Sequence, residues 1–416
     1  MKVAVVGSGI SGLVCAHLLS REHEVHVFEA ADFLGGHTHT VDIQTPSGKF
    51  AIDTGFIVFN NWTYPNFVKL LDRMGVRSQE SAMSFSVKTE ESGLEYNGTD
   101  MNRLFAQRSN LFRPSFHRMI RDILRFNRES VKLLEGSDDL LSLGDYLTTH
   151  RYSREFIEDY VIPMGAAVWS SSVEQMLGFP ARYFVQFFKN HGFLAVNERP
   201  VWRVVSGGSR SYHDPLTTPF RERIRLNTPV LAIQRLDDGV RLKLGGRGVG
   251  ETDFDQVILA SHSDQALKLL SEPSPLEREV LGAFVYQRNE TVLHTDTSVM
   301  PRRKLAWAAW NYLVPKVRQN TVSVTYDMNI LQGIEAPETF LVSLNLETRL
   351  DPEKVLRRFT YHHPVYTPRA VGAQKRWSEI SGKSRTHFCG AYWGYGFHED
   401  GVSSALRVCE SFGVKL

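Results

Sequence analysis

The sequence predicts an α/β protein with two domains, one built on parallel strands and the other an α+β domain built on an antiparallel sheet. Three observations predict this class: a strand–helix–strand pattern at the start of the chain, apolar strand-like runs in its middle and at its end, and alternating runs between them. With 416 residues, the chain is long enough for two or three domains. Its hydrophobic content of 42% and charged content of 23% are typical of a globular protein.

The first strand–helix–strand unit surrounds a glycine motif. A β-branched run at 2–6 is typical of a buried parallel strand, an apolar run at 13–19 follows as a helix, and 24–28 forms the second strand. The residues between the first strand and the helix have the pattern Gly-x-Gly-x-x-Gly over 7–12. In this context the pattern indicates a Rossmann-like unit that binds a dinucleotide.

Each position of the motif meets a physical demand of dinucleotide binding. Gly7 permits the tight turn, Gly9 lets the backbone approach a pyrophosphate, and Gly12 lets the helix pack closely on the strand. The start of the helix, at Ile10 and Ser11, offers unpaired N–H groups and a positive dipole end to the phosphates. These five residues are therefore expected to hold the cofactor.

The residues after the second strand distinguish the possible cofactors. Glu29 ends that strand, where its carboxylate can accept hydrogen bonds from both ribose hydroxyls, which favours FAD or NAD over NADP. The run 29–38 reads E-A-A-D-F-L-G-G-H-T. This run and 52–56 resemble the flavin amine oxidase and phytoene desaturase superfamily. The resemblance implies an amine-oxidase-like domain with noncovalent FAD, contacted here by Ala30, Gly36, His37, Thr38, Gly55 and Phe56.

Later segments resemble the same superfamily. Glycines at 207 and 208 precede a predicted helix, and predicted strands follow at 227–233 and 254–260. The resemblance implies that the backbone at the position of Val230 pairs with adenine, and that the helix opened by the turn 396–402 points its N-terminal amides at the flavin, where they stabilise negative charge. The implied cofactor contacts here are Val230, Gly390, Glu399, Asp400 and Val402.

A narrower resemblance and several departures concern the substrate. Phrases at 294–296, 300–301, 363–365 and 394–401 resemble a bacterial group of NAD/FAD-binding proteins. Relatives of that group desaturate methyl-branched fatty acyl chains during furan fatty acid synthesis. Amine oxidases usually place a lysine near the flavin, whereas the comparable run 304–312 carries a lysine only at its edge. Simple amine oxidation is therefore disfavoured.

The flavin motifs occur at both ends and in the middle of the chain, so the FAD-binding domain is predicted to be discontinuous. Alternating runs at 83–88 and 321–326 and an apolar-rich run at 340–346 predict the antiparallel sheet of the substrate domain, and 114–134 and 153–161 predict helices. The FAD-binding domain is assigned to 1–85, 201–270 and 380–416, and the substrate domain to 86–200 and 271–379.

The candidate catalytic residues lie in the turn before the last helix. His398 is proposed as a base, because removing two hydrogens from an alkyl chain releases a proton; the alternative is a packed side chain with only backbone contacts to the flavin. Phe397 stands where amine oxidases have an aromatic-cage tyrosine. Aromatic residues that could wall an apolar tunnel, or form an interdomain core, are Trp307, Trp310, Tyr312, Trp393, Tyr395 and Phe397. No metal site is predicted.

A basic, partly apolar segment at 103–128 raises the question of a membrane contact. It holds seven arginines and one acidic residue, and from Ser115 its spacing is that of an amphipathic helix, which either meets an anionic membrane surface or is simply solvated. The formal charge of +2 disfavours nucleic acid as a partner. The expected location is cytoplasmic, with the inner membrane surface as an alternative, and the oligomeric state is not indicated.

Three functions fit these observations. The first is an FAD-dependent oxidoreductase that dehydrogenates a hydrophobic substrate, such as a methyl-branched fatty acyl chain of a phospholipid, by hydride transfer to flavin. The second is an amine or amino-acid oxidase that makes an imine and hydrogen peroxide. The third is a flavin- or lipid-binding protein without catalysis.

Overall fold

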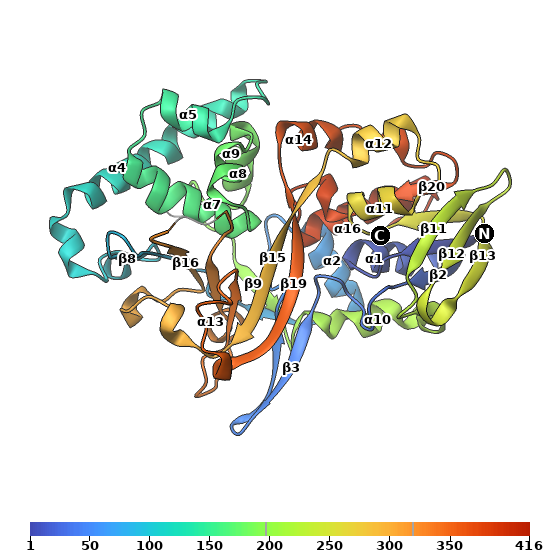
Figure 1. Ribbon diagram of the computed structural model, residues 1–416, viewed down its shortest axis with the longest axis horizontal. Helices are drawn as coiled ribbons and strands as arrows, with labels where there is room; N and C mark the ends of the chain where they lie inside the picture. Colours follow the sequence, from blue (N-terminus) through green and yellow to red (C-terminus); the bar gives the residue numbers. More distant parts are fainter. Residues whose placement is uncertain (196–197, 318–319) are drawn as a thin grey trace.

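The structure, a computed structural model, describes residues 1–195, 198–317 and 320–416. Figure 1 shows two lobes, with the long paired strands β15 (Val285–His294) and β19 (Val355–Val365) running between them. Both termini lie in the right-hand lobe, which holds the parallel strands, and the left-hand lobe is largely helical. The assignment of the five segments to two domains stays a prediction.

A five-stranded parallel sheet forms the centre of the right-hand lobe. Its order is β10-β2-β1-β14-β20, and every neighbouring pair is parallel. Because both faces of such a sheet are covered, its central strand β1 is buried and apolar from Val3 to Val6 rather than alternating. The strands are β1 (Lys2–Val6), β2 (Glu24–Phe28), β10 (Ile224–Arg225), β14 (Gln256–Leu259) and β20 (Thr386–Phe388).

Alternate residues of β1 pack on two different layers. Val3 and Val5 share a core with helices α1 (Ile10–Leu19), α2 (Pro65–Met74) and α16 (His398–Ser411). Ala4 and Val6 face the opposite core. That second layer contains α11 (Ser263–Leu269), α12 (Pro275–Leu281), α14 (Pro368–Gln374) and α15 (Trp377–Ile380), with the antiparallel strands β11 (Val230–Arg235), β12 (Val240–Leu244) and β13 (Gly250–Phe254).

The largest sheet of the described chain has seven strands, in the order β19-β15-β18-β17-β16-β7-β8. Its neighbours are antiparallel, as predicted, except that β16 and β7 are parallel. The helices of the left-hand lobe lie between β8 and β16 in the sequence, so this pair is not a hairpin. The remaining strands of the sheet are β7 (Phe85–Thr89), β8 (Leu94–Asn97), β16 (Trp310–Val314), β17 (Val324–Asp327) and β18 (Leu341–Leu344).

Smaller elements connect the lobes. The hairpin β3 (Thr40–Thr45) and β4 (Gly48–Asp53) projects at the bottom of Figure 1, and β5 (Val58–Asn60), β9 (Trp202–Val205) and β6 (Ser78–Glu80) form a three-stranded sheet. The strand predicted at 254–260 is divided between two sheets, because β13 ends at Phe254 beside β12 and β14 begins at Gln256 beside β1. Between them, the Asp255 carboxylate accepts the N–H of Lys2 at 2.6 Å. Two short helices also belong to this group of smaller elements: α10 (His213–Thr217) and α13 (Met328–Gln332).

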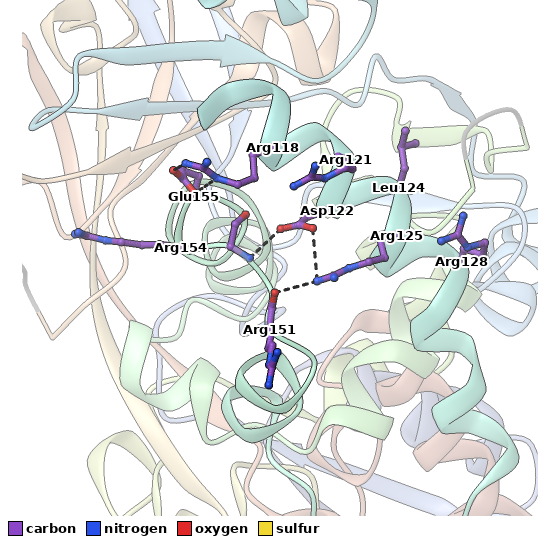
Figure 2. A pocket seen from close by; sticks show the side chains of 10 residues that line it. Arg118, Arg121, Asp122, Leu124, Arg125, Arg128, Arg151, Arg154 and Glu155 are labelled. Atoms are coloured by element: carbon purple, nitrogen blue, oxygen red, sulfur yellow. Dashed lines mark hydrogen bonds and ion pairs between the residues drawn. The ribbon is translucent and has the colours of Figure 1, made fainter. Parts of the chain in front are cut away.

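The left-hand lobe is built from short helices around an aromatic core. The helix predicted at 114–134 is α4, which ends at Glu129 and continues as a 3₁₀ turn; the one predicted at 153–161 begins as α6 and passes through a π-helical turn into α7. Figure 2 shows the arginines of α4 beside Arg151 and Arg154. The helices are α3 (Met101–Leu104), α4 (Pro114–Glu129), α5 (Leu143–Thr149), α6 (Arg154–Phe156), α7 (Ile162–Trp169), α8 (Val173–Leu177) and α9 (Ala181–Asn190).

Among the described residues, no helix combines the length and apolar character that a membrane crossing needs.

Candidate cofactor and substrate site

A cavity of about 870 Å³ extends from the glycine motif into the left-hand lobe. We call its two parts the cofactor end and the substrate end. The cofactor end is lined by the glycine motif, by the ends of the parallel strands and by two loops that we call the glycine loops, one around Gly36 and the other around Gly55. The lining residues are Gly7, Ser8, Gly9, Ile10, Ser11, Glu29, Ala30, Gly36, His37, Gly55, Phe56, Val230 and Gly390. The substrate end is lined by Ala167, Val168, Trp169, Ser170, Phe187, His191, Phe193, Trp202, Trp310, Tyr326, Leu344, Tyr395 and Phe397.

The glycine motif has the geometry that a dinucleotide requires. Gly7 has φ +102°, and a Cβ there would lie 2.8 Å from the Ala260 carbonyl oxygen. A Cβ on Gly12 would overlap the carbonyl of Gly7, so α1 could not pack this closely on β1. A Cβ on Gly9 would meet no protein atom within 4 Å, because this position faces the cavity. The space in front of Gly9 therefore fits a pyrophosphate at the start of α1.

Glu29 is held in place by the backbone around it. One carboxylate oxygen accepts the N–H of Ser8 at 2.9 Å and its hydroxyl at 2.6 Å, and the other accepts the N–H of Ala31 at 2.9 Å. The side chain still lines the cavity, so lone pairs remain for ribose hydroxyls. Val230, at the start of β11, lines the same part of the cavity, where the adenine is expected.

The two glycine loops are locked together beside the motif. The N–H of Phe56 donates to the His37 carbonyl at 2.6 Å, and a Cβ on Gly55 would overlap that oxygen. The His37 ring is buried in the cavity wall, and its Nε2 has no partner among the described residues. Burial, with neighbouring His363 and His262, lowers the pKa of His37 well below its usual value, so it is a neutral ring that can donate to or accept from a cofactor.

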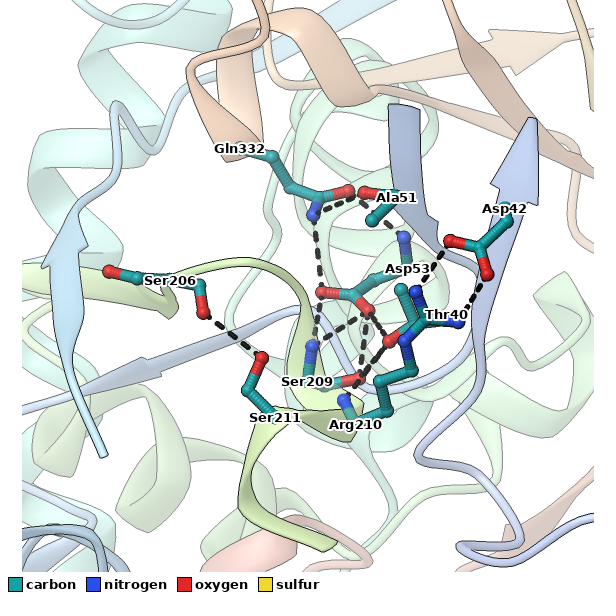
Figure 3. A network of polar contacts seen from close by, with 9 residues as sticks. All are labelled: Thr40, Asp42, Ala51, Asp53, Ser206, Ser209, Arg210, Ser211 and Gln332. Carbon is teal, nitrogen blue, oxygen red and sulfur yellow. Dashed lines mark hydrogen bonds and ion pairs between the residues drawn. The ribbon is translucent and has the colours of Figure 1, made fainter. Parts of the chain in front are cut away.

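A buried carboxylate, Asp53, ties these loops to segments that are distant in the sequence. Asp53 accepts hydrogen bonds from the Thr40 hydroxyl at 2.6 Å, from the N–H and hydroxyl of Ser209 at 2.9 and 2.8 Å, and from the Gln332 amide at 3.3 Å (Figure 3). A Cβ on Gly208 would crowd Thr40, which explains the glycine before Ser209. Burial raises the pKa of Asp53 to about 6. The network fixes the hairpin that leads into the Gly55 loop.

Five predicted cofactor residues do not line the cavity with their side chains. The Glu399 carboxylate points away to α2 and accepts the N–H groups of Asn66 and Phe67 at 3.1 and 2.9 Å. Asp400 caps α16 by accepting the Phe397 N–H at 2.9 Å, and burial raises its pKa to about 7. The others lie in the protein interior: Gly12, Thr38 and Val402. These five residues lie behind the cavity wall rather than in it.

His398 is packed on three sides. Its ring stacks on Phe56 with centroids 3.5 Å apart, and its Nε2 lies 3.0 Å from both the Thr38 and Tyr212 hydroxyls. Burial, and to a lesser extent His213, lowers its pKa to about 3. The ring lines the cavity as a neutral group. These contacts favour the structural alternative over the role of a base, which stays a prediction.

The substrate end is aromatic and uncharged. Of the six aromatic residues predicted to form a tunnel, only Trp310, Tyr395 and Phe397 line the cavity. Phe397 stacks on Phe187 with centroids 5.1 Å apart. The charged residues that line the cavity in the described chain are Glu29 and Lys268, which belong to the right-hand lobe and not to the substrate end. Lys304 does not line it either.

The sequence reading missed His191, which lines the substrate end just after α9. Its Nδ1 lies 3.0 Å from the carbonyl of Phe187, and because a carbonyl only accepts, Nδ1 is the protonated nitrogen and Nε2 carries the lone pair. Burial lowers its pKa to about 4. A lone histidine between aromatic residues is usually core, so no sequence signal singled it out.

Comparisons with known proteins agree with this geometry. Residues 10–295 match the family described as flavin containing amine oxidoreductase. An L-amino acid oxidase from Cerastes cerastes is 23% identical over an alignment of 320 residues, and the match covers 70% of this chain but only 56% of that enzyme. The chain thus spans little more than half the length of that relative.

Solved structures show the same fold over the whole chain. Putrescine oxidase bound to putrescine has a TM-score of 0.70 at 16% identity and covers 99% of both chains. Cyclohexylamine oxidase from Brevibacterium oxydans IH-35A has a TM-score of 0.69 at 13% identity, covering 99% of both chains. A fatty acid isomerase from P. acnes has a TM-score of 0.71 at 15% identity, covering 99% of this chain and 98% of its own. The chain therefore belongs to the flavin containing amine oxidoreductase family of FAD-dependent oxidoreductases.

Proposed function

We propose that this enzyme dehydrogenates an uncharged, hydrophobic substrate, and that this substrate is a methyl-branched fatty acyl chain of a phospholipid. The observation that carries the proposal is the absence of charged side chains from the described lining of the substrate end. A diamine or an amino acid would bring an ammonium or carboxylate into this aromatic space, where an unpaired charge is costly to bury. An alkyl chain has no such cost and gains from burial.

Two further points support an acyl substrate. The narrower resemblance noted in the sequence is to a bacterial group whose relatives desaturate methyl-branched acyl chains on the way to furan fatty acids. The fatty acid isomerase, which by its name acts on a fatty acid, shares the fold over nearly the whole chain. The family's amine chemistry therefore need not extend to this member.

The reaction removes a hydride and a proton from adjacent carbons. Bound FAD supplies the hydride acceptor. His191 accepts the proton at Nε2, because its Nδ1 is already committed to the Phe187 carbonyl and its ring faces the substrate end. Phe397 and Trp310 hold the alkyl chain by apolar contact. His398 positions the Phe56 loop through its stacking and its two hydroxyl contacts.

The second candidate function is an amine or amino-acid oxidase. It is favoured by the family match and by the L-amino acid oxidase relative. The lining of the substrate end offers no carboxylate for an amine and no arginine for an amino-acid carboxylate within the described residues. We therefore rank it below the acyl substrate.

Anaerobic bleaching of the bound flavin tests these functions. The purified holoenzyme is mixed with micelles of phospholipid carrying a methyl-branched acyl chain, with the straight-chain phospholipid as the matched control, and in parallel with amines and amino acids. The proposal expects bleaching by the branched phospholipid and an acyl product two mass units lighter. Bleaching by amines alone would favour the second function. No bleaching by any of them would favour a non-catalytic flavoprotein.

A further inference from the structure

A second cavity, of about 820 Å³, lies on α4, and none of its lining residues lines the first one. Its lining consists of arginines from α4, from the α5–α6 connection and from the start of α6, with two acidic residues, Ser153 and one leucine (Figure 2). We call the six arginines and Leu124 the arginine face. The arginines are Arg118, Arg121, Arg125, Arg128, Arg151 and Arg154.

The arginine face has more positive than negative charge. The two acidic residues in its lining are Glu155, which pairs with Arg118, and Asp122, whose carboxylate lies 3.5 Å from Arg125. Two more acidic residues pair with the face from outside its lining, Glu129 at 3.0 Å from Arg128 and Glu158 at 2.8 Å from Arg154. Six arginines thus face four carboxylates. Within the described chain no ion pair is recorded for Arg121 or Arg151.

Arg151 sits in an unusual backbone conformation. Its φ is +52°, in the left-handed region where a helix that has just ended normally places glycine. It comes after His150, the residue that caps the end of α5, and the carbonyls of both residues accept hydrogen bonds from Arg125 at 3.3 Å. Arg151 therefore adopts a strained backbone conformation that glycine would adopt more easily, and its side chain adds positive charge to the cavity.

Apolar side chains are exposed on the same segment. Leu124 lies within the arginine face and is 54% exposed, although its neighbour Phe126 is buried in the core. Just before α4, Phe112 is 87% exposed and Leu111 is exposed beside it. Arginines interleaved with exposed apolar side chains are what an amphipathic helix presents to a bilayer: cations meet lipid phosphates and apolar groups enter the acyl boundary.

We propose that the arginine face docks the enzyme on an anionic phospholipid bilayer, with α4 parallel to its surface and Leu124 and Phe112 reaching below the phosphates. Charge complementarity and the exposed apolar residues carry the assignment: nucleic acid would leave Leu124 and Phe112 without a partner, and a neutral bilayer would leave Arg121 and Arg151 without one. The inference does not depend on which substrate the enzyme uses.

Flotation of the full-length holoprotein with vesicles tests the docking. Vesicles of phosphatidylcholine and phosphatidylglycerol in equal parts are compared with pure phosphatidylcholine. Arg121→Glu/Arg128→Glu is expected to lower binding to the anionic vesicles by at least about 25-fold, since each basic residue near such a surface contributes a factor of roughly five. Phe112→Ser is expected to weaken the binding that persists at high salt.

A charge-matched control separates docking from net charge. Arg247→Glu/Arg278→Glu changes two exposed arginines, one next to β12 and one on α12, and should bind anionic vesicles like the wild type; both elements belong to the right-hand lobe, whereas α4 belongs to the left-hand one (Figure 1). Flavin absorbance verifies folding, and Arg121→Gln/Arg128→Gln replaces the reversal variant if that variant loses its flavin. The proposal would be overturned if the two double variants lost vesicle binding equally, or if the wild type bound both kinds of vesicle equally well. It would also be overturned if free inorganic phosphate alone suppressed the binding.

Discussion

The two ends of the main cavity are built in different ways. At the cofactor end, most of the recognition is by backbone: glycines leave space, α1 offers its N–H groups, and the first 29 residues supply much of the wall. At the substrate end, recognition is by side chains from α7, α9, β16, β17 and the turn before α16, which are far apart in the sequence. The cofactor end is therefore specific for one ligand, whereas single substitutions at the substrate end can change which substrate binds there.

The largest expected effect comes from Gly9→Val. Its side chain would enter the space where no protein atom lies within 4 Å, so the chain should fold but lose almost all bound flavin. Absorbance of the purified protein measures the flavin, and circular dichroism measures the fold.

Gly12→Val is the matched comparison for the glycine motif. Its side chain would overlap the Gly7 carbonyl, so it should destabilise the fold itself, by about 3 kcal/mol or more. A Gly9→Val protein that keeps full flavin occupancy would contradict the placement of the pyrophosphate.

The next largest effect is expected on the rate of flavin reduction, when two histidines of the cavity are replaced in turn. His191→Phe should slow flavin reduction by the substrate by at least about 100-fold, because it removes a proton acceptor. Flavin content should be unchanged, since His191 belongs to the substrate end.

His398→Gln should slow the same step less than about 10-fold and leave its pH profile unaltered, because the ring holds Thr38, Tyr212 and Phe56 rather than the substrate. Stopped-flow reduction under anaerobic conditions measures both variants. If the order of the two effects is reversed, His398 is the base and His191 is structural.

The same contrast explains what could be predicted from the sequence. The parallel strands and the glycine motif were readable, because a turn, a close approach and a helix start each limit the residue at one local position. The role of Glu399 was not, because its partners Asn66 and Phe67 lie more than 300 residues away. His191 was hidden for a similar reason: the cavity that gives it a function is closed by strands and turns from the second half of the chain.

A smaller effect concerns the aromatic wall. Trp310 lies edge-on to Tyr326 with ring centroids 5.3 Å apart, and both line the substrate end. Trp310→Ala should loosen the substrate and lower the rate of flavin reduction about 10-fold, since small misplacements of a reacting carbon are costly. Trp307→Ala is the control, because Trp307 lies outside the cavity lining. Equal effects of the two would indicate a general loss of stability.

The smallest effect is on the pH dependence of stability. Five buried or half-buried histidines of the cavity have lowered pKa values, with burial as the largest cause: about 4 for His191, His262 and His363, about 3 for His398, and well below the usual value for His37. In the unfolded chain each titrates near 6.5. Their contribution to stability is therefore present above pH 6.5 and is lost as the pH falls towards 4, because only the unfolded chain takes up protons there.

Two buried carboxyls oppose this trend. Asp400 and Asp53 keep their protons up to about pH 7 and 6 in the folded protein, so their contribution is present at low pH and is lost as the pH rises through those values. Because these five histidines outweigh the two carboxyls, the Tm of the holoprotein should fall by about 5 °C between pH 7 and pH 5. His262→Gln should make this decline shallower, and Asp400→Asn should make it steeper, in scanning calorimetry. A Tm that rises on acidification would mean that the carboxyls dominate, and that the cavity histidines are charged rather than neutral in the folded enzyme.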